Sequence, residues 1–146
     1  MTGPLISVLM PAYNHERYVE AAIRSVMEQD FPRIELLVVD DGSKDGTWGG
    51  LQRLRGECES RFERVELVTQ ENQGTCGTMN RLCRAARGDF VLVLASDDAL
   101  LPGALRRLVA PMLADAAVGV TVGRNELMDG AGRTCYWDAE RRTTYE

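Results

Sequence analysis

Short apolar runs alternate along the chain with longer segments in which apolar side chains recur at helical spacing. Five of these runs are rich in β-branched residues and predict strands over Leu5–Met10, Ile34–Asp40, Val65–Val68, Asp89–Ala95 and Val118–Gly123. Several of them are apolar at consecutive positions, so both faces of the strand would be buried. This pattern is typical of a parallel sheet that helices cover on both sides.

The segments between the strands predict helices. His15–Gln29 carries an apolar stripe with Asn14 as its N-cap, and Gly88 is well placed to stop the third helix. The other helices are expected after the polar loop Asp40–Thr47, over Thr75–Arg87 and over Pro102–Leu113. This alternation predicts an α/β fold: a Rossmann-like, mostly parallel sheet flanked by helices on both faces, in a single domain over residues 1–146. Residues 129–146 predict a turn and one more strand without a covering helix.

Composition narrows the class of protein. The chain has 146 residues and a formal net charge of −5, and no apolar run approaches the length of about 18 residues that a membrane span needs. The opening residues lack a basic leader, so we expect a cytoplasmic protein, at most peripheral to the inner membrane. Scattered basic residues argue against nucleic acid as a partner. The four cysteines have no C-x-x-C spacing, which indicates free, partly buried thiols and neither a zinc site nor disulfides.

Polar side chains gather in the loops that follow the first four predicted strands. These loops are Pro11–Asn14, Asp40–Thr47, Gln70–Thr75 and Ser96–Asp98. Ligands of open α/β sheets bind at this edge, where the carboxyl ends of the strands meet. The loops contain neither G-x-G-x-x-G nor a P-loop, and Lys44 is the only lysine, so a bound phosphate would need a metal ion for neutralisation. Their oxygen-rich composition favours Mg²⁺ or Mn²⁺.

Asp97 and Asp98 stand side by side where a buried strand ends. Two adjacent carboxylates repel, which predicts a cation next to them. Taken alone, the pair is weak evidence, because a solvated turn or a helix-capping pair is the more common cause of such a sequence.

Two long stretches together resemble a known family. "ISVLMPAYNHERYVEAAIRSVMEQDFPRIELLVVDDGSKDGT" resembles the opening of the family-2 glycosyltransferases, and "ENQGTCGTMNRLCRAARGDFVLVLASDDALLPGAL" resembles their next block in order and spacing. The resemblance covers residues 5 to about 130. It implies a type-A glycosyltransferase fold, a nucleoside-diphosphate sugar donor with UDP-sugar preferred, a divalent metal, Mn²⁺ or Mg²⁺, and inversion at the anomeric carbon.

The resemblance also assigns roles to single residues. It implies that Tyr13 packs on the base, that Asp41 accepts a hydrogen bond from the base edge, and that Gly74 lies near the diphosphate and the sugar. The start of the helix at Gly74 also favours bound anions on physical grounds. The full set assigned to the donor is Pro11, Ala12, Tyr13, Asn14, Asp40, Asp41, Gly74, Ser96 and Asp98.

The acidic turn carries the implied metal ligand and one departure from the family. Asp97 corresponds to the last acid of the D-x-D element and would bind the metal, while Asp98 would approach the donor sugar or brace the loop. The family usually has an acid where this chain has Ala95. We interpret Ala95 as a tolerated variant, because Asp97 and Asp98 remain.

Other polar and aromatic residues in these loops have simpler explanations. Tyr13 and Asp41 could be a core-edge aromatic and a turn acid, and His15 is expected to be a surface residue at a helix start. The remaining side chains are interpreted as caps and turn residues (Ser43, Asp45 and Thr47), core residues (Trp48 and Met79) and loop-bracing amides (Asn72 and Asn80).

Inverting transfer to a glycan or other hydroxyl acceptor also needs a carboxylate base. The family takes it from a later segment, and nothing in their context selects Asp129, Asp138 or Glu140. The chain therefore resembles the donor-binding half of a transferase whose acceptor segment is missing. Its last strands would lack cover, which favours a homo-oligomer.

Three other classes of function fit the sequence less well. A non-catalytic nucleotide-sugar-binding or interaction module on the same fold is the main alternative, because no base is identified. A phosphoacceptor signalling domain would need an Asp after the third strand and a Lys after the fifth, where the chain reads "VTQEN" and "VGRNE". A nucleotidyltransferase would carry a glycine-rich basic loop near the first strand, and "MPAYNHERY" is not one.

Overall fold

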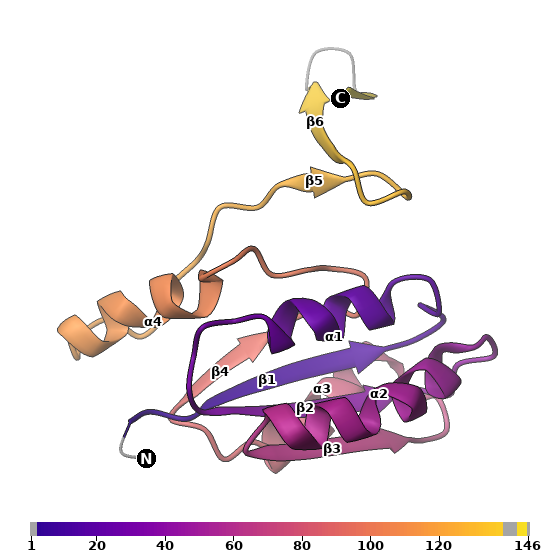
Figure 1. Ribbon diagram of the computed structural model, residues 1–146, viewed down its shortest axis with the longest axis horizontal. Coiled ribbons are helices and arrows are strands. Elements are labelled where there is room, and N and C mark those ends of the chain that lie inside the picture. Colours follow the sequence, from indigo (N-terminus) through magenta and orange to yellow (C-terminus); the bar gives the residue numbers. More distant parts are fainter. Residues whose placement is uncertain (1–2, 139–142, 146) are drawn as a thin grey trace.

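A four-stranded parallel sheet forms the centre of the protein in the computed structural model, which describes residues 3–138 and 143–145. Its strand order is β3-β2-β1-β4 (Figure 1). Ile6 of β1 is in register with Ile34 of β2 and with Phe90 of β4. The strands span Ile6–Ala12 (β1), Ile34–Asp40 (β2), Arg64–Thr69 (β3) and Phe90–Val93 (β4).

Helices cover both faces of this sheet, as the alternating pattern predicts. α1 and α2 lie on one face, and α3 packs against β1 and β2 on the other (Figure 1). Side chains of β1 alternate accordingly: Val8 and Met10 join the core under α1 and α2, and Leu9 joins the smaller core under α3. Every residue of β2 is buried, because both of its faces are covered. The helices span Val19–Met27 (α1), Thr47–Arg61 (α2), Gly74–Ala85 (α3) and Ala104–Ala114 (α4).

Two predicted helix boundaries are wrong. α1 begins at Val19 with Tyr18 at the N-cap position, whereas Asn14 has a φ of 54° and its side-chain oxygen accepts a hydrogen bond from the Lys44 backbone. α3 ends at Ala85, so Gly88 does not stop it. Gly88 is needed for close packing instead, because a Cβ there would lie 2.6 Å from the Ser7 backbone nitrogen.

The predicted strand Val118–Gly123 is also wrong. The structure has no strand there, and Val120 and Val122 are 79% and 86% exposed. A β-branched run becomes a strand only when another strand pairs with it. Within the described chain β4 pairs with β1 alone, and the Thr121 hydroxyl instead donates to the carbonyl of Leu108 in α4.

The predicted C-terminal turn and strand are confirmed. A turn over residues 129–132 joins the antiparallel strands β5 and β6, and β7 pairs with β6. These three strands form a small second sheet, which Figure 1 shows on the α1 side of the main sheet. They span Leu127–Met128 (β5), Thr134–Asp138 (β6) and Thr143–Tyr145 (β7).

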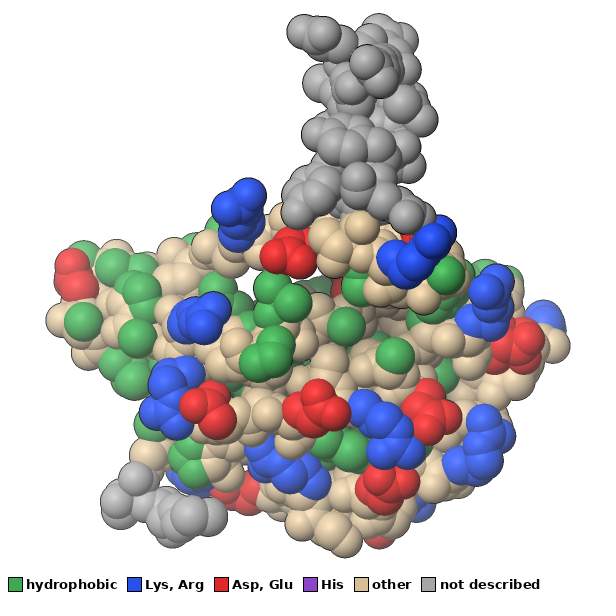
Figure 2. Space-filling model, turned by 45° about the horizontal axis from the view of Figure 1, so that its top comes forward, with side chains coloured by type: hydrophobic (Ala, Val, Ile, Leu, Met, Phe, Trp, Pro, Cys, Tyr) green, Lys and Arg blue, Asp and Glu red, His purple; other side chains and the backbone are tan. Residues whose placement is uncertain are grey.

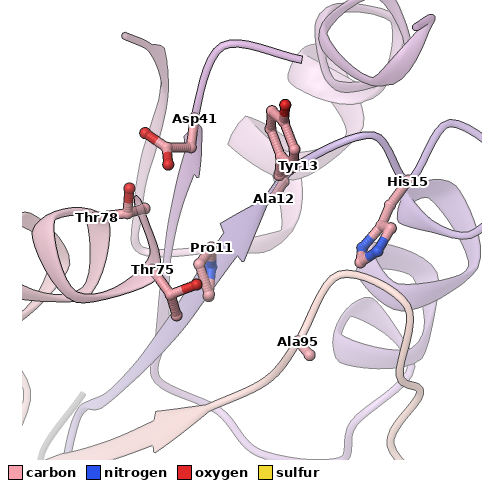
Figure 3. A pocket seen from close by; sticks show the side chains of 8 residues that line it. All are labelled: Pro11, Ala12, Tyr13, His15, Asp41, Thr75, Thr78 and Ala95. Carbon is pink, nitrogen blue, oxygen red and sulfur yellow. The ribbon is translucent and has the colours of Figure 1, made fainter. Parts of the chain in front are cut away.

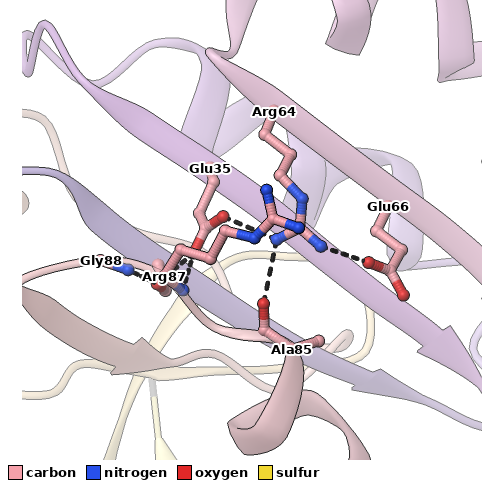
Figure 4. A network of polar contacts seen from close by, with 7 residues as sticks. Glu35, Arg64, Glu66, Ala85, Arg87 and Gly88 are labelled. Carbon is pink, nitrogen blue, oxygen red and sulfur yellow. Dashed lines mark hydrogen bonds and ion pairs between the residues drawn. The ribbon is translucent and has the colours of Figure 1, made fainter.

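A buried polar network lies at the amino-terminal edge of the main sheet (Figure 4). The Glu35 carboxylate accepts hydrogen bonds from the Ser7 hydroxyl, from the Arg87 backbone N–H at 2.6 Å and from the Arg64 guanidinium at 2.8 Å. Arg64 also donates to Glu66 at 2.6 Å, and the Gly88 N–H donates to the Ser7 hydroxyl at 2.8 Å. The network joins β1 and β2 to the segment that leads into β4.

The surface in Figure 2 carries acidic and basic side chains interspersed, without a block of one sign on that face. Many of them are paired, as in the ion pairs of Arg24 with Glu20 and Glu57. None of the described helices is long and apolar enough to span a bilayer. The three cysteines whose side chains are described, Cys58, Cys76 and Cys83, are free, as expected; Cys58 is buried and the other two are exposed.

Candidate functional site

A hollow of about 190 Å³ opens at the carboxyl end of β1 and β2, beside the start of α3. The end of β1 lies between two walls: Asp41 and α3 on one side, and His15 with Ala95 on the other (Figure 3). The residues that line the hollow are Pro11, Ala12, Tyr13, His15, Asp41, Thr75, Thr78 and Ala95. The loops that the sequence analysis selects therefore do converge on one site.

Asp41 forms the most polar part of this hollow. The residue is 4% exposed, and its Oδ1 accepts hydrogen bonds from the Gln70 side chain and from the Gln73 backbone N–H, both at 2.8 Å. Burial by itself would raise the pKa of Asp41, but these bonds, with others from Thr78 and the Gly74 N–H, hold the pKa below its usual value. The side chain is therefore an ionised hydrogen-bond acceptor at the start of α3, where the helix dipole favours it.

Gln70 supports Asp41 from behind the hollow, and sequence reasoning selects its loop but not this residue. Its side-chain NH₂ donates to Asp41 and, at 3.0 Å, to the Thr78 hydroxyl. Arg81 donates in turn to the Gln70 side-chain oxygen at 2.9 Å. Thr78 also lines the hollow, and its hydroxyl is fully buried. Because it lies four residues into α3, only the polar start of that helix could have pointed to it in the sequence.

Asp40 lies behind the hollow and does not line it. Its side chain is 1% exposed and follows the alternation of β2 toward the α1–α2 face, where the Thr69 hydroxyl donates to Oδ2 at 2.9 Å. Asp40 Oδ1 is buried and has no hydrogen-bond partner among the described residues. Gly74, by contrast, begins α3 next to Thr75 at the hollow and has a φ of +73°.

The rim is built by side chains that bridge the loops after β1 and β2. The Asn14 N–H donates to the Ser43 hydroxyl at 2.9 Å, and the Glu16 N–H donates to the Asp45 carboxylate at 3.0 Å. Asp45 also accepts hydrogen bonds from the Thr47 N–H and hydroxyl. Ser43, Asp45 and Thr47 are thus turn and loop-bridging residues, and Asn14 joins them as a loop brace. None of them is the N-cap of α2, which is Gly46.

His15 contradicts the expectation of a surface residue at a helix start. It lines the hollow, and its Nδ1 lies 2.8 Å from the Ser96 hydroxyl oxygen, a buried group. Its Nε2 lies 3.7 Å from Oδ2 of Asp97, whose side chain is about half exposed. The contact to Ser96 spans 81 residues of sequence, so no local pattern could have indicated it.

Asp97 and Asp98 lie on an exposed turn that the Asp98 N–H closes by donating to the Ala95 carbonyl at 3.0 Å. Among the residues with described side chains, neither acid forms an ion pair with Lys or Arg, and no three acidic, histidine or cysteine side chains gather into a metal cage. A magnesium-type site commonly uses one or two carboxylates and completes its shell with substrate phosphates and water. The donor set at this turn therefore fits a metal that arrives with an anionic ligand.

Of the three candidate bases, only Asp129 has a described side chain, and it does not line the hollow. The Asp129 carboxylate accepts hydrogen bonds from the Arg133 and Ala131 backbone N–H groups within its own turn and pairs with the Arg133 side chain. The Arg133 backbone and side-chain bonds are the main reason that the pKa of Asp129 lies below its usual value. Asp138 ends β6, and Glu140 lies outside the described residues.

With this geometry established, comparison with known proteins gives the family. The model of "Glycosyl transferase family 2" matches residues 7–138. The chain belongs to this family. An uncharacterised glycosyltransferase of Nostoc sp. is 35% identical over 129 residues, which is 88% of this chain and 39% of that protein.

This family-2 chain is also similar to a relative with a named activity and to a protein of known structure. The UDP-Glc:α-D-GlcNAc-diphosphoundecaprenol β-1,3-glucosyltransferase WfgD of Escherichia coli is 32% identical over 99% of this chain and 55% of its own length. The mannosyltransferase PcManGT of Pyrobaculum calidifontis, solved with GDP-Man and Mn²⁺, has a TM-score of 0.72 and 29% identity over 81% of this chain and 34% of its own. The predicted type-A glycosyltransferase fold is confirmed. This chain spans only about half of these relatives' length or less.

Proposed function

We propose that this chain is the donor-binding domain, over residues 1–146, of an inverting, metal-dependent glycosyltransferase. The sugar would pass from a nucleoside-diphosphate sugar, preferably a UDP-sugar, to a hydroxyl of a glycan or other acceptor. One observation carries the proposal: a buried, ionised Asp41 lines one wall of a hollow at the carboxyl edge of the sheet, and Ala95 on the opposite wall begins the turn that contains Asp97 (Figure 3).

The hollow has the properties of a base pocket. Its volume of about 190 Å³ is below the roughly 300–1,000 Å³ of pockets that hold whole ligands, so it would take the base and leave the sugar outside. Asp41 would accept a ring N–H of the base, and Tyr13, which is 46% exposed, would stack on its face. Uracil and guanine both present such an N–H. The small volume favours uracil, in agreement with the UDP-glucose named for the Escherichia coli relative.

Two features of the chain suit a diphosphate beside that pocket. The N-cap residue of α3, Gln73, forms no side-chain cap. The Gly74 N–H donates to the Asn72 side chain at 3.2 Å, so the N–H groups that follow it in the first turn are the ones that would meet an anion. Asp97, in the turn that also contains Ser96 and Asp98, would hold Mn²⁺ or Mg²⁺. When bound, such an ion stabilises the charge that develops on a leaving diphosphate. PcManGT was solved with both a sugar nucleotide and Mn²⁺.

The chain's own residues account for binding and orientation of the donor. Inversion also requires a base that takes the acceptor proton. The residues around the hollow include no candidate for that role, because Asp41 faces the base and Asp97 the metal. We therefore assign donor binding to this chain and no catalytic base. A domain that binds a nucleotide sugar without turnover is the second candidate, and the lack of a candidate base among the residues around the hollow favours it.

Thermal unfolding tests the binding proposal. UDP with Mn²⁺ at about 100 times its Kd should stabilise the protein by about 2.7 kcal/mol, which raises Tm by about 5–10 °C. Asp97→Asn should abolish the Mn²⁺-dependent part of the shift and keep the part caused by UDP alone. Asp30→Asn, at an exposed residue paired with Arg106, is the matched control and should behave as wild type.

Two results would contradict the proposal. One is a wild-type protein whose Tm responds to neither UDP nor GDP in the presence of Mn²⁺ or Mg²⁺. The other is an Asp97→Asn protein that keeps the full Mn²⁺-dependent shift. Given binding, an assay for donor hydrolysis or transfer separates the two candidate functions, because a binding module would show neither.

A further inference from the structure

We propose that His15 is a second protein ligand of the divalent ion, joining Asp97 through its Nε2 atom. This inference rests on the proposed function, since it concerns the metal that accompanies the donor. It starts from a contact between two loops: His15 follows β1 and Asp97 follows β4, yet Nε2 and Oδ2 are 3.7 Å apart.

The separation of these two atoms fits a shared metal better than a direct bond. At 3.7 Å it exceeds the range of about 2.7–3.2 Å for an N–H···O hydrogen bond. Metal–ligand bonds of about 2.1 Å place two ligand atoms at most about 4.2 Å apart. One ion can therefore contact both atoms with little movement of either side chain.

The contact with Ser96 allows His15 the form that a metal ligand needs. Its buried hydroxyl lies 2.8 Å from Nδ1, and no other hydrogen bond of this hydroxyl is found among the described residues. When Nδ1–H donates to the Ser96 oxygen, Nε2 carries a lone pair directed at the acidic turn. Metal-binding histidines commonly use the other ring nitrogen in this way.

Two further contacts hold His15, one at its backbone and one at its ring. The His15 backbone N–H donates to the Thr47 hydroxyl at 2.8 Å, and Tyr18 packs edge-on against the imidazole with centroids 6.2 Å apart. The side chain is 31% exposed, so a hydrated ion can reach Nε2. An orientation fixed before binding lowers the entropic cost of capturing the ion.

An imidazole ligand changes which metal the site prefers. Carboxylates and phosphates suit Mg²⁺ and Mn²⁺ alike, whereas imidazole favours the transition metals. With His15 in the shell, the protein–UDP complex should bind Mn²⁺ more tightly than Mg²⁺. Loss of the ring nitrogen should reduce that preference.

The decisive experiment uses the fact that His15 is the only histidine of the chain. Tag-free protein with ¹⁵N-histidine is loaded with Mn²⁺ and unlabelled UDP, and electron spin-echo envelope modulation detects nitrogen bound to the ion. A ¹⁵N coupling that changes to ¹⁴N in unlabelled protein and disappears in His15→Asn is the expected result. A spectrum that does not respond to the label overturns the proposal.

Affinities measured by Mn²⁺ and Mg²⁺ titration of the protein–UDP mixture give a second readout. His15→Asn keeps an amide near the Nδ1 position for Ser96 but has no atom at Nε2, so the affinity for Mn²⁺ should fall at least about tenfold and that for Mg²⁺ less. Asp30→Asn, at an exposed residue paired with Arg106, is the control and should leave both affinities unchanged. Equal losses for the two metals would contradict ligation by nitrogen.

The outcomes separate this proposal from the one on which it rests. If wild-type protein binds no nucleotide with either metal, the proposed function fails. If wild-type binding depends on Asp97 but the ¹⁵N label is not detected and His15→Asn keeps its Mn²⁺ affinity, only the role of His15 fails. A lower Mn²⁺ affinity of His15→Asn without a ¹⁵N coupling in wild type would also reject the ligand role.

Discussion

Replacement of Glu35 by glutamine tests whether the buried network of Figure 4 stabilises the fold. The carboxylate is fully buried in β2 and accepts bonds from the Ser7 hydroxyl, the Arg87 N–H and the Arg64 guanidinium. Glutamine has the same shape but only one acceptor oxygen. If that oxygen faces Ser7 and Arg87, the amide NH₂ group lies against the Arg64 donor. In the reverse orientation the NH₂ group lies against the Ser7 and Arg87 donors.

The size of the loss follows from these contacts. A charge-assisted hydrogen bond contributes about 1.5–3 kcal/mol, and a buried donor left unpaired costs about 1–3 kcal/mol. Arg64 is 25% exposed and keeps its bonds to Glu66 and to the Ala85 carbonyl, so it can partly compensate. We therefore expect Glu35→Gln to lower the free energy of unfolding by about 2–3 kcal/mol, below the 3–5 kcal/mol typical of a broken buried ion pair.

Urea denaturation at neutral pH measures this loss, provided that the m value is unchanged. Glu66→Gln is the matched control, because Glu66 pairs with the same Arg64 but is 34% exposed, and its loss should stay below about 1 kcal/mol. Equal losses in the two variants, or a loss below about 1 kcal/mol in Glu35→Gln, would refute the argument that burial gives the network its strength.

We also predict how the stability difference between wild type and Glu35→Gln depends on pH. Burial alone would raise the pKa of Glu35, but the bonds from Ser7, Arg87 and Arg64 bring the pKa in the folded protein below the ordinary value of 4.5. A carboxyl group with a lowered pKa contributes stability above its unfolded pKa and loses it as the pH falls through its folded pKa. The stability difference between wild type and Glu35→Gln should be full at neutral pH and shrink only below about pH 4.5.

Three further changes have specific expected outcomes. Gly88→Ala should lower the free energy of unfolding by about 1–3 kcal/mol in urea denaturation, because a Cβ there would lie 2.6 Å from a β1 backbone nitrogen. Gly56→Ala, which has open space around it on α2, should instead stabilise the protein. Burial raises the pKa of the Cys58 thiol to about 11, so iodoacetamide at pH 8 should label the two exposed described cysteines and spare Cys58 in a peptide mass map. Asp41→Asn should weaken UDP binding at least about tenfold by calorimetry, and an unchanged Kd would remove Asp41 from the base pocket.

The parts of the fold that sequence reasoning predicts are those set by local patterns. The central strands β1 and β2 are apolar at most positions, because both faces of the sheet are covered there. The four polar loops had to lie together, since parallel strands end at one edge, and Asp41 and Tyr13 do share the hollow. The family resemblance added roles that this geometry accommodates.

The errors all concern contacts between segments far apart in sequence. Val118–Gly123 has a strand pattern without a partner strand among the described residues. Asn14 is a residue type that often caps helices, but its side chain accepts a hydrogen bond from the loop after β2. α1 therefore starts at Val19, five residues after Asn14. His15 was expected at the surface, because nothing local indicates its contact with the hydroxyl of Ser96.

The position of the acidic turn depends on structure at the opposite edge of the sheet. β4 has only four residues and pairs with β1 alone among the described strands, so its ladder by itself specifies the register weakly. The Arg87 and Gly88 N–H groups, which donate to Glu35 and Ser7, anchor the chain immediately before β4 begins. This anchoring sets where Asp97 emerges relative to His15, so the buried network that stabilises the fold also sets the geometry of the proposed metal site.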